Sequence, residues 1–161
     1  MCEVNVDTIR RAHKICPVTA IQSEYHLMHR MVETNGVLEL CEDLGIGFVP
    51  YSPLNRGFLG GMINEYTKFD VTNDNRQTLP RFQPEAIRAN YRIVEVLNAF
   101  GRTRGITPAQ IALAWLMNKK PFIVPIPGTT KLHRLQENLA ADQVSFSPEE
   151  LSAVQAALDQ I

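Results

Sequence analysis

The sequence contains few of the features that mark secreted or membrane proteins. Its three cysteines, Cys2, Cys16 and Cys41, are an odd number and lack the spacing of a disulfide framework. No N-terminal apolar run resembles a signal peptide, and charges or prolines interrupt every hydrophobic segment before it reaches the roughly 20 residues of a membrane span. We therefore expect a soluble protein of the reducing cytosol.

The sequence also lacks an excess of either charge. Lys and Arg number 16 against 17 Asp and Glu, so nothing in the net charge of −1 favours nucleic acid or an anionic membrane as partner. Metal binding has little support, because the pairs His13/Cys16 and His26/His29 are not matched by a second ligand pair at a convincing spacing. We predict no metal site and place these histidines on the surface.

Apolar residues recur at helical spacing in six segments, and 161 residues with 45% hydrophobic content suffice for one domain over residues 1–161. The first helix is capped by Asn5 and stops at Pro17. The second begins near Asn35 and ends at Gly45. Their inward faces are predicted to carry Ile9, Ala12 and Cys16 in the first, and Val37, Leu40, Cys41 and Leu44 in the second.

The four later helices carry clear start signals or apolar stripes. Thr107-Pro108 starts one helix, residues 131–140 form another, and Ser147-Pro148-Glu149-Glu150 is a capping box with proline at the first helical position. The inward positions are Ile87, Tyr91, Val94 and Leu97 in the third helix, and Leu151, Val154, Leu158 and Ile161 in the last.

Three short, nearly all-apolar segments are predicted to be strands: Val18 to Gln22, Ile46 to Pro50 and Phe122 to Ile126. Strands without polar alternation, separated by helices, indicate an α/β fold with a parallel sheet covered on both faces. A doubly wound sheet and a (β/α)8 barrel share this pattern, but a barrel needs about 250 residues and eight strands. Residues 55–83 are rich in turn residues and too long for an ordinary connection, so we expect a functional or mobile loop.

Ligands of parallel α/β folds bind beyond the carboxyl ends of the strands, which points to residues 22–25, 51–57 and 128–138. Pro127-Gly128-Thr129-Thr130-Lys131 offers backbone N–H groups and side-chain donors to an anion such as phosphate, although an ordinary threonine-capped helix start has the same pattern. Tyr51 and Ser52 could stack on a flat heterocycle or form a packed turn. Arg134, Glu137 and Asn138 share one helix face, as nucleotide ligands or as a solvated ion-pair face.

These segments together resemble the aldo-keto reductase family in order and spacing. The resemblance rests on Gln22-Ser23-Glu24-Tyr25, Phe48 to Leu54, Gly57, Ile126 to Thr130 and Arg134 to Leu139. It is strongest to the branch of oxidoreductases related to potassium-channel β-subunits, and Met1 to Val4 resembles the end of the fifth barrel strand. The resemblance implies the last three to four βα units of a (β/α)8 TIM barrel plus a C-terminal helix.

The resemblance also implies NADP(H) as cofactor and a small carbonyl compound as substrate. Gln22 would bond the nicotinamide carboxamide and Tyr51 would stack on the ring. The pyrophosphate would be lined by Ser52, Leu54, Arg56 and Gly57. The adenosine end and its 2′-phosphate would be held by Gly128, Thr129, Thr130, Lys131 and Arg134, with Glu137 and Asn138 near adenine.

Two departures from the family pattern matter. Cys2 stands where the family usually has a serine that touches the carboxamide. The family's catalytic Tyr, Lys, Asp and His lie on its first four strands, so no residue here is predicted to be catalytic, and Tyr25, Tyr51, Tyr66 and Tyr91 have no evident lysine or carboxylate partners. We expect the isolated chain to be nearly inactive.

Three hypotheses follow. The first is a truncated piece or remnant of an NADPH-dependent carbonyl reductase that retains the cofactor half. The second is an NADP(H)-binding module without chemistry. The third is an assembly unit, in which half-barrels pair through N–H and C=O groups exposed at their first and last strands. The sequence does not identify the carbonyl substrate.

Overall fold

The structure is a computed structural model that describes residues 1–159. It contains the six predicted helices in α/β order: α1 (Val6–Ile15), α2 (Val37–Leu44), α3 (Pro84–Arg104), α4 (Pro108–Met117), α5 (Leu132–Leu139) and α6 (Pro148–Leu158). Two regular strands are present, β1 (Ala20–Glu24) and β2 (Gly47–Tyr51). Short 3-10 turns occupy η1 (Met31–Glu33), η2 (Asn55–Gly60), η3 (Asn75–Thr78), η4 (Pro80–Phe82) and η5 (Ala140–Gln143). Ile161, predicted to face inward, lies outside the described residues.

The helix boundaries follow the local signals that the sequence carries. Thr107 and Ser147 each accept the N3 backbone N–H of their helix, and both capping boxes are complete. Gly45 ends α2 in the left-handed conformation, with φ 65°, as a C-terminal glycine should. One inward prediction is wrong: Cys16 is exposed, because α1 ends at Ile15 and Cys16 continues in extended conformation.

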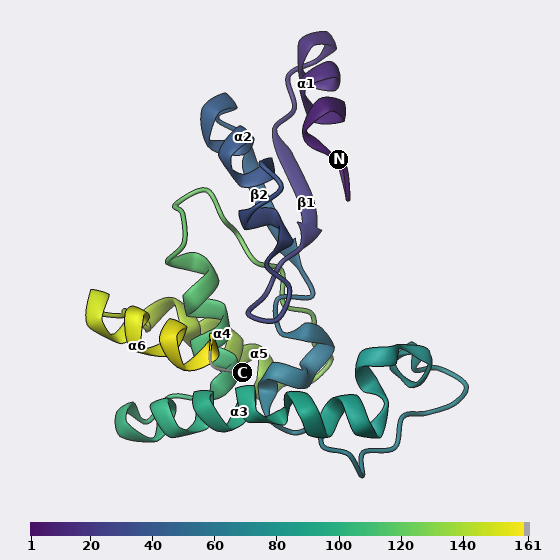
Figure 1. The fold of residues 1–161 in the computed structure, drawn as a ribbon, viewed down its shortest axis with the longest axis vertical. Helices are drawn as coiled ribbons and strands as arrows, with labels where there is room; N and C mark the ends of the chain where they lie inside the picture. The colour runs from purple at the N-terminus through teal and green to yellow at the C-terminus, as the bar shows by residue number, and fades with distance from the viewer. Residues whose placement is uncertain (160–161) are drawn as a thin grey trace.

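The sheet consists of four parallel extended segments. β1 and β2 pair in register, with Gln22 opposite Val49. Cys2 pairs with Gln22 on the outer side of β1, and Ile123 pairs with Phe48 on the outer side of β2. The spatial order is therefore residues 1–3, β1, β2 and residues 122–126, which is the order of consecutive βα units. In Figure 1 the strands lie beside α1 and α2, while α3 to α6 gather in the other half of the molecule.

The last segment departs from the prediction because of its prolines. Residues 122–126 bond β2 through Val124 and Ile126 but form only an isolated bridge. On their outer side, Pro125 and Pro127 have no N–H, and the Ile123 N–H donates to the Lys120 carbonyl at 3.1 Å. The expectation that both open edges expose donors and acceptors is therefore wrong for this edge, which offers carbonyl groups alone.

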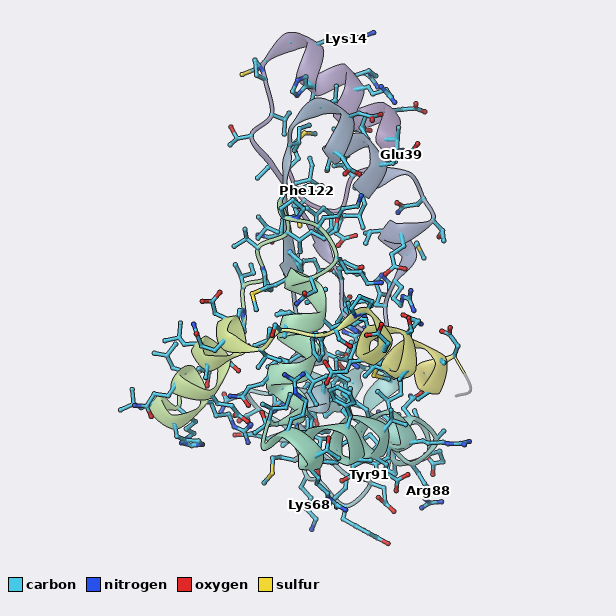
Figure 2. The ribbon with its side chains drawn as sticks, turned by 90° about the vertical axis from the view of Figure 1, so that its left-hand side faces the viewer. Lys14, Glu39, Lys68, Arg88, Tyr91 and Phe122 are labelled. Atoms are coloured by element: carbon cyan, nitrogen blue, oxygen red, sulfur yellow. The ribbon has the colours of Figure 1, made fainter. Side chains whose placement is uncertain are left out.

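The core joins the sheet to α4. Tyr25 packs at the end of β1, with its ring centroid 5.6 Å from Trp115 and 6.1 Å from Phe48. Every residue of α4 from Ile111 to Leu116 is buried, since this helix passes through the middle of the molecule. Figure 2 shows Lys14 and Glu39 at one end and Lys68 and Arg88 at the other. Within residues 1–159, no helix has the length and apolar character needed to cross a bilayer.

Candidate functional site

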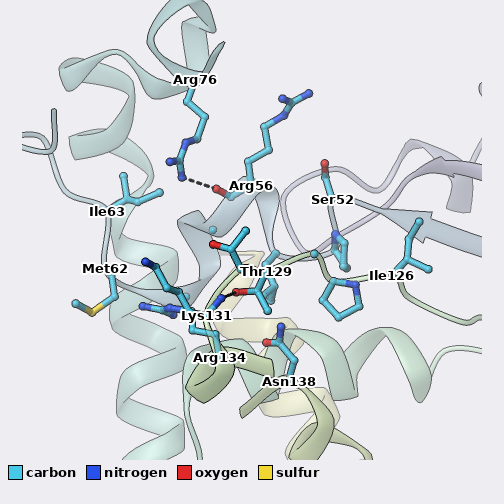
Figure 3. A pocket seen from close by; sticks show the side chains of 17 residues that line it. Ser52, Arg56, Met62, Ile63, Arg76, Ile126, Thr129, Lys131, Arg134 and Asn138 are labelled. Carbon is cyan, nitrogen blue, oxygen red and sulfur yellow. Dashed lines mark hydrogen bonds between the residues drawn. The ribbon is translucent and has the colours of Figure 1, made fainter. Parts of the chain in front are cut away.

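A cleft of about 720 Å³ opens where β2 and residues 122–126 end. Three parts of the chain form it: the turn after β2, the long loop before α3, and the segment that leads into α5 (Figure 3). It is lined by Ser52, Pro53, Leu54, Arg56, Gly57, Gly60, Met62, Ile63, Arg76, Ile126, Pro127, Gly128, Thr129, Thr130, Lys131, Arg134 and Asn138.

Ten of the thirteen residues predicted for cofactor binding line this one cleft. The three that do not are Gln22, Tyr51 and Glu137. Gln22 lies one strand away, in a smaller hollow of about 370 Å³ that also includes Cys2 and Val49. Glu137 faces Arg134, with 3.6 Å between carboxylate and guanidinium. The large cleft is therefore distinct from a smaller hollow on the face of the sheet.

The turn after β2 has an unusual backbone. Ser52, Asn55 and Arg56 have φ values of 49°, 47° and 52°, the left-handed region that costs a non-glycine residue about 1–2 kcal/mol. Gly57 follows at φ 95°. The core holds this turn in place, because Asn55 and Phe58 are buried to 2% and 1% exposure. Strain kept at such a place is characteristic of sites that position a ligand.

Asn55 ties this turn to the loop after β1. Its Nδ2 lies 3.3 Å from the Met28 sulfur, and its buried Oδ1 has no hydrogen-bond partner among the described residues. A buried acceptor without a partner costs about 1–3 kcal/mol, so the turn adopts its shape despite two separate penalties. The tight packing of the turn against the core offsets both.

Arg76 is the charged cleft residue that sequence reasoning missed. Its guanidinium donates to the Arg56 carbonyl at 2.9 Å and to both carboxylate oxygens of Asp74, and it lies 4.7 Å from the Phe69 ring centroid. These hydrogen bonds hold the pKa of Asp74 below its usual range. No motif marks Arg76, because it reaches the cleft only through the path of the long loop.

The cleft is strongly cationic. Arg56, Arg76, Lys131 and Arg134 line it, and no carboxylate does. Asp74 and Glu137 stand behind two of these cations as ion-pair partners. The remaining positive charge favours a ligand with more than one negative group, and guanidinium groups bind phosphate in paired hydrogen bonds. Figure 3 shows Lys131 and Arg134 on one side and Arg56 and Arg76 on the other.

The segment before α5 is open to solvent. Thr129 Oγ1 accepts the Lys131 N–H at 3.1 Å, so this hydroxyl closes a local turn, while the N-cap residue Lys131 makes no side-chain cap bond. The alternative of a threonine-capped helix is therefore wrong, because the Thr129 hydroxyl accepts the N–H of Lys131, which precedes the first helical residue, Leu132. Arg134 does form the predicted ion pair with Glu137 and still lines the cleft. Space surrounds Gly128, where no atom lies within 4 Å of an added Cβ.

The smaller hollow lies on the sheet face beside Cys2 and Gln22, and Glu3, Glu24 and Tyr51 follow at the ends of the strands. The Cys2 sulfur is 3.8 Å from Gln22 Oε1, and Glu3 Oε1 accepts the Glu24 N–H at 2.7 Å. Tyr51 stands opposite Glu24 in the sheet register. Burial and the nearby Glu3 carboxylate raise the pKa of Tyr51 to about 12, so its hydroxyl stays protonated at neutral pH.

His26 corrects the surface assignment of the histidines. It is 1% exposed, its Nδ1 accepts the Met28 N–H at 3.2 Å, and its Nε2 lies 3.1 Å from Glu24 Oε1. Nε2 therefore carries the proton, and burial lowers the pKa of this imidazole to about 4. The sequence pattern did not predict this burial, because it depends on the turn after β1, in which His26 pairs with His29. Within residues 1–159, no three His, Cys, Asp or Glu side chains are grouped to hold a metal ion.

Tyr25 corrects a second expectation. Its hydroxyl donates to Glu33 at 2.6 Å, and Glu33 also pairs with Arg30 at 2.6 Å and Lys119 at 3.4 Å. Carboxylate and lysine partners do exist, but Tyr25 is fully buried in the core. Burial and the Glu33 contact raise its pKa far above the usual value. This group therefore stabilises the fold and does not border the cleft.

Comparison with known proteins gives one consistent result. The model of the Aldo/keto reductase family matches residues 1–159. "Probable aldo-keto reductase 1" from Glycine max is 43% identical over 154 residues, which are 96% of this chain and 44% of the soybean protein. The thermostable aldo-keto reductase Tm1743, solved with the inhibitor epalrestat, is 25% identical with a TM-score of 0.70, over 97% of this chain and 46% of its own.

The glycerol dehydrogenase AKR11B4 from Gluconobacter oxydans shares the fold with a TM-score of 0.88 at 22% identity, over 99% of this chain and 48% of its own. The chain thus spans about half the length of these relatives.

Proposed function

The chain belongs to the aldo/keto reductase family, and from that premise we propose that residues 1–159 form the NADP(H)-binding half of an oxidoreductase that reduces aldehydes or ketones to alcohols. The observation that carries the proposal is the cleft with four cations and no carboxylate, set at the ends of parallel strands. Its volume of about 720 Å³ falls within the usual range of cofactor sites.

The residues present fit a dinucleotide phosphate. In the proposal, the strained turn from Ser52 to Gly57 bonds the pyrophosphate, with Arg56 and Arg76 as counter-charges. Gly128 leaves room for phosphate oxygens next to the backbone, because no atom lies within 4 Å of an added Cβ there. Lys131 and Arg134 meet the 2′-phosphate, which is the reason for preferring NADPH over NADH.

The sheet ends would receive the nicotinamide. In the proposal, Tyr51 stacks on the ring and Gln22 bonds the carboxamide, with the Cys2 thiol next to Gln22. When bound there, NADPH supplies the hydride that reduces a carbonyl carbon. The role of these side chains is to hold the ring against the sheet face and to orient one side of it toward the substrate.

We assign proton transfer to no described residue. Tyr25 donates to Glu33 inside the core, and Tyr66 is 80% exposed in the long loop. General acid catalysis contributes about 10²–10⁴-fold to rate, so these residues alone should bind cofactor with little or no turnover. The same observation favours the alternative of a binding module without chemistry. We also place the protein in the reducing cytosol, because all three cysteines are free.

The decisive experiment is fluorescence titration of the purified chain with NADPH and, in parallel, NADH. We expect saturable binding that prefers NADPH, and loss of that preference in Arg134→Met. A matched control is Arg102→Met, an exposed cation on α3 that does not line the cleft. A chain that is folded by circular dichroism yet binds neither nucleotide contradicts the proposal. Oxidation of NADPH in the presence of an aldehyde would overturn the statement that proton transfer lies elsewhere.

A further inference from the structure

The long loop before α3 is fastened to the turn after β2 by two hydrogen bonds that run in opposite directions. The Arg56 guanidinium donates to Asn75 Oδ1 at 3.0 Å. The Arg76 guanidinium donates to the Arg56 carbonyl at 2.9 Å (Figure 3). Arg76 thereby covers a carbonyl oxygen that would otherwise repel an anion. The turn and this part of the loop therefore form one unit at the cleft.

The Arg76 guanidinium is held on two further sides. Its Nε and Nη2 donate to the Asp74 carboxylate, and it lies 4.7 Å from the Phe69 ring centroid. The Phe69 ring in turn packs edge-on against Phe82, which is 3% exposed. A guanidinium has five N–H groups, and within residues 1–159 Asp74 and the Arg56 carbonyl take three of them. Two N–H groups are therefore left for a ligand in the cleft that Arg76 lines.

The Asp74 carboxylate also has a local role that does not need its charge. Its Oδ1 accepts the Arg76 backbone N–H at 3.0 Å and caps η3. An amide oxygen can cap equally well, whereas the paired bonds to the guanidinium depend on a carboxylate. Asp70 forms a similar local turn, in which it accepts the Thr72 N–H at 2.8 Å, but its hydrogen bonds do not reach Arg76. The loop thus contains two comparable aspartates that differ in their contact with Arg76.

We propose that Asp74 is a positioning residue, which holds the Arg76 guanidinium in one orientation with its two remaining N–H groups toward a phosphate of the ligand. The inference rests on the proposed function, since it requires a phosphate-bearing ligand in the cleft. An arginine without these contacts would lose rotamer freedom on binding, whereas Arg76 has lost it already during folding. Ordering one such side chain lowers affinity by up to about tenfold.

The negative charge of Asp74 acts in the opposite direction, because it weakens the attraction between the cleft and an anion. The side chains of Asp74 and Arg76 are 21% and 30% exposed, so solvent and salt screen this repulsion. A phosphate on the far side of the guanidinium would lie about one Debye length, roughly 8 Å, from the carboxylate, and the repulsion then amounts to about twofold in affinity. The orienting effect is therefore the larger of the two, and its excess should grow as salt is added.

Fluorescence titration with NADPH and NADH, at physiological and at high ionic strength, tests the proposal. Asp74→Asn should weaken binding of both nucleotides alike, by about fivefold at physiological ionic strength and up to about tenfold at high salt. In the Arg76→Met background the same substitution should have no further effect, because it acts through that guanidinium. The control Asp70→Asn makes the same chemical change in the same loop and should stay within about twofold of the native affinity.

Equal or tighter binding by Asp74→Asn, with a native chain that binds, overturns the inference alone. So does a loss that persists in the Arg76→Met background, or an equal loss in Asp70→Asn, because either result would place the effect in the folding of the loop. A native chain that binds neither nucleotide rejects the proposed function and the inference with it. Should Asp74→Asn fail to fold by circular dichroism, Asp74→Ser, which keeps a capping oxygen, takes its place in the same comparisons.

Discussion

The two walls of the cleft are built in opposite ways. The buried wall, residues 52–59, contains Asn55, Phe58 and Leu59 at 0–2% exposure and adopts strained left-handed backbone. The exposed wall, residues 127–138, is open to solvent from Gly128 to His133, and α5 buries none of its residues. Folding therefore fixes the shape of one wall, while the other mainly supplies charge. A ligand would meet a preformed surface on one side and adaptable side chains on the other.

Truncating one side chain in each wall tests most directly whether the two walls differ in their contribution to stability. Phe58→Ala should lower the free energy of unfolding by about 3–5 kcal/mol, because it leaves a cavity in the core. His133→Ala, on the exposed face of α5, should change it by less than about 0.5 kcal/mol. Urea unfolding followed by circular dichroism measures both. Similar losses in the two variants would show that the walls do not differ in this way.

Acid should loosen the buried wall through His26. The folded pKa of about 4 lies below the ordinary 6.5, so both states are neutral above pH 6.5 and the unfolded state alone takes up a proton between pH 6.5 and 4. Stability should therefore fall by about 3 kcal/mol over this range. Protonation also removes the Nδ1 acceptor of Met28, which contacts Asn55.

The measurement is urea unfolding at several pH values for the native chain and for His26→Gln. The glutamine does not titrate, so the variant should lose less stability between pH 6.5 and 4. Glu33, whose pKa is lowered, loses stability in acid in both proteins and cancels in the difference, whereas Glu24 bonds His26 itself and contributes to the difference. Identical pH slopes would remove His26 from this account.

The charges of the two walls should differ in what they discriminate. Arg134→Met should weaken NADPH binding by about 10–100-fold and leave NADH unchanged, since a charged hydrogen bond contributes about 1.5–3 kcal/mol. Arg76→Met should weaken both nucleotides alike, because the pyrophosphate is common to them. Paired titrations give the two ratios. Loss of NADH binding in the Arg134 variant would show that the phosphate assignments are wrong.

The smallest contrast is that between two glycines. Gly57→Ala places a side chain at φ 95° and should cost about 1–2 kcal/mol of unfolding free energy. Gly128→Ala meets no atom within 4 Å and no left-handed backbone, so the change should stay within about 0.5 kcal/mol. Thermal unfolding of the two variants side by side is sufficient. A larger loss at Gly128 would mean that the exposed wall is the more constrained one.

Sequence reasoning predicted the features that depend on neighbouring residues. The six helices, the Ser147 capping box and the C-terminal Gly45 follow from local hydrogen bonding, and the parallel sheet follows from short apolar strands. Ten predicted residues of the site meet in one cleft because the family motifs fall at the ends of adjacent strands. Whether they bind the cofactor remains the proposal under test.

The failures share a physical cause, which is contact between residues brought together by loops. Arg76 reaches the cleft through a loop without periodicity, and the loop after β1 folds over His26. The Tyr25 network likewise joins residues as far apart as Glu33 and Lys119. The boundaries of β1 shifted two residues toward the carboxyl end, because Ala20 is the first residue paired with β2. The hydrophobic pattern of the sequence does not specify such long-range contacts or the register of the strands.

The effect of the prolines in the last strand can be described in the terms of polymer chemistry. A sheet with two competent edges behaves as a bifunctional monomer, and stepwise addition of such units gives long fibres. Pro125 and Pro127 remove the donors from one edge, so this chain resembles a monomer with one full and one half-competent end. A half-competent end still adds to a full one, so the prolines weaken each junction of such a polymer without stopping its growth.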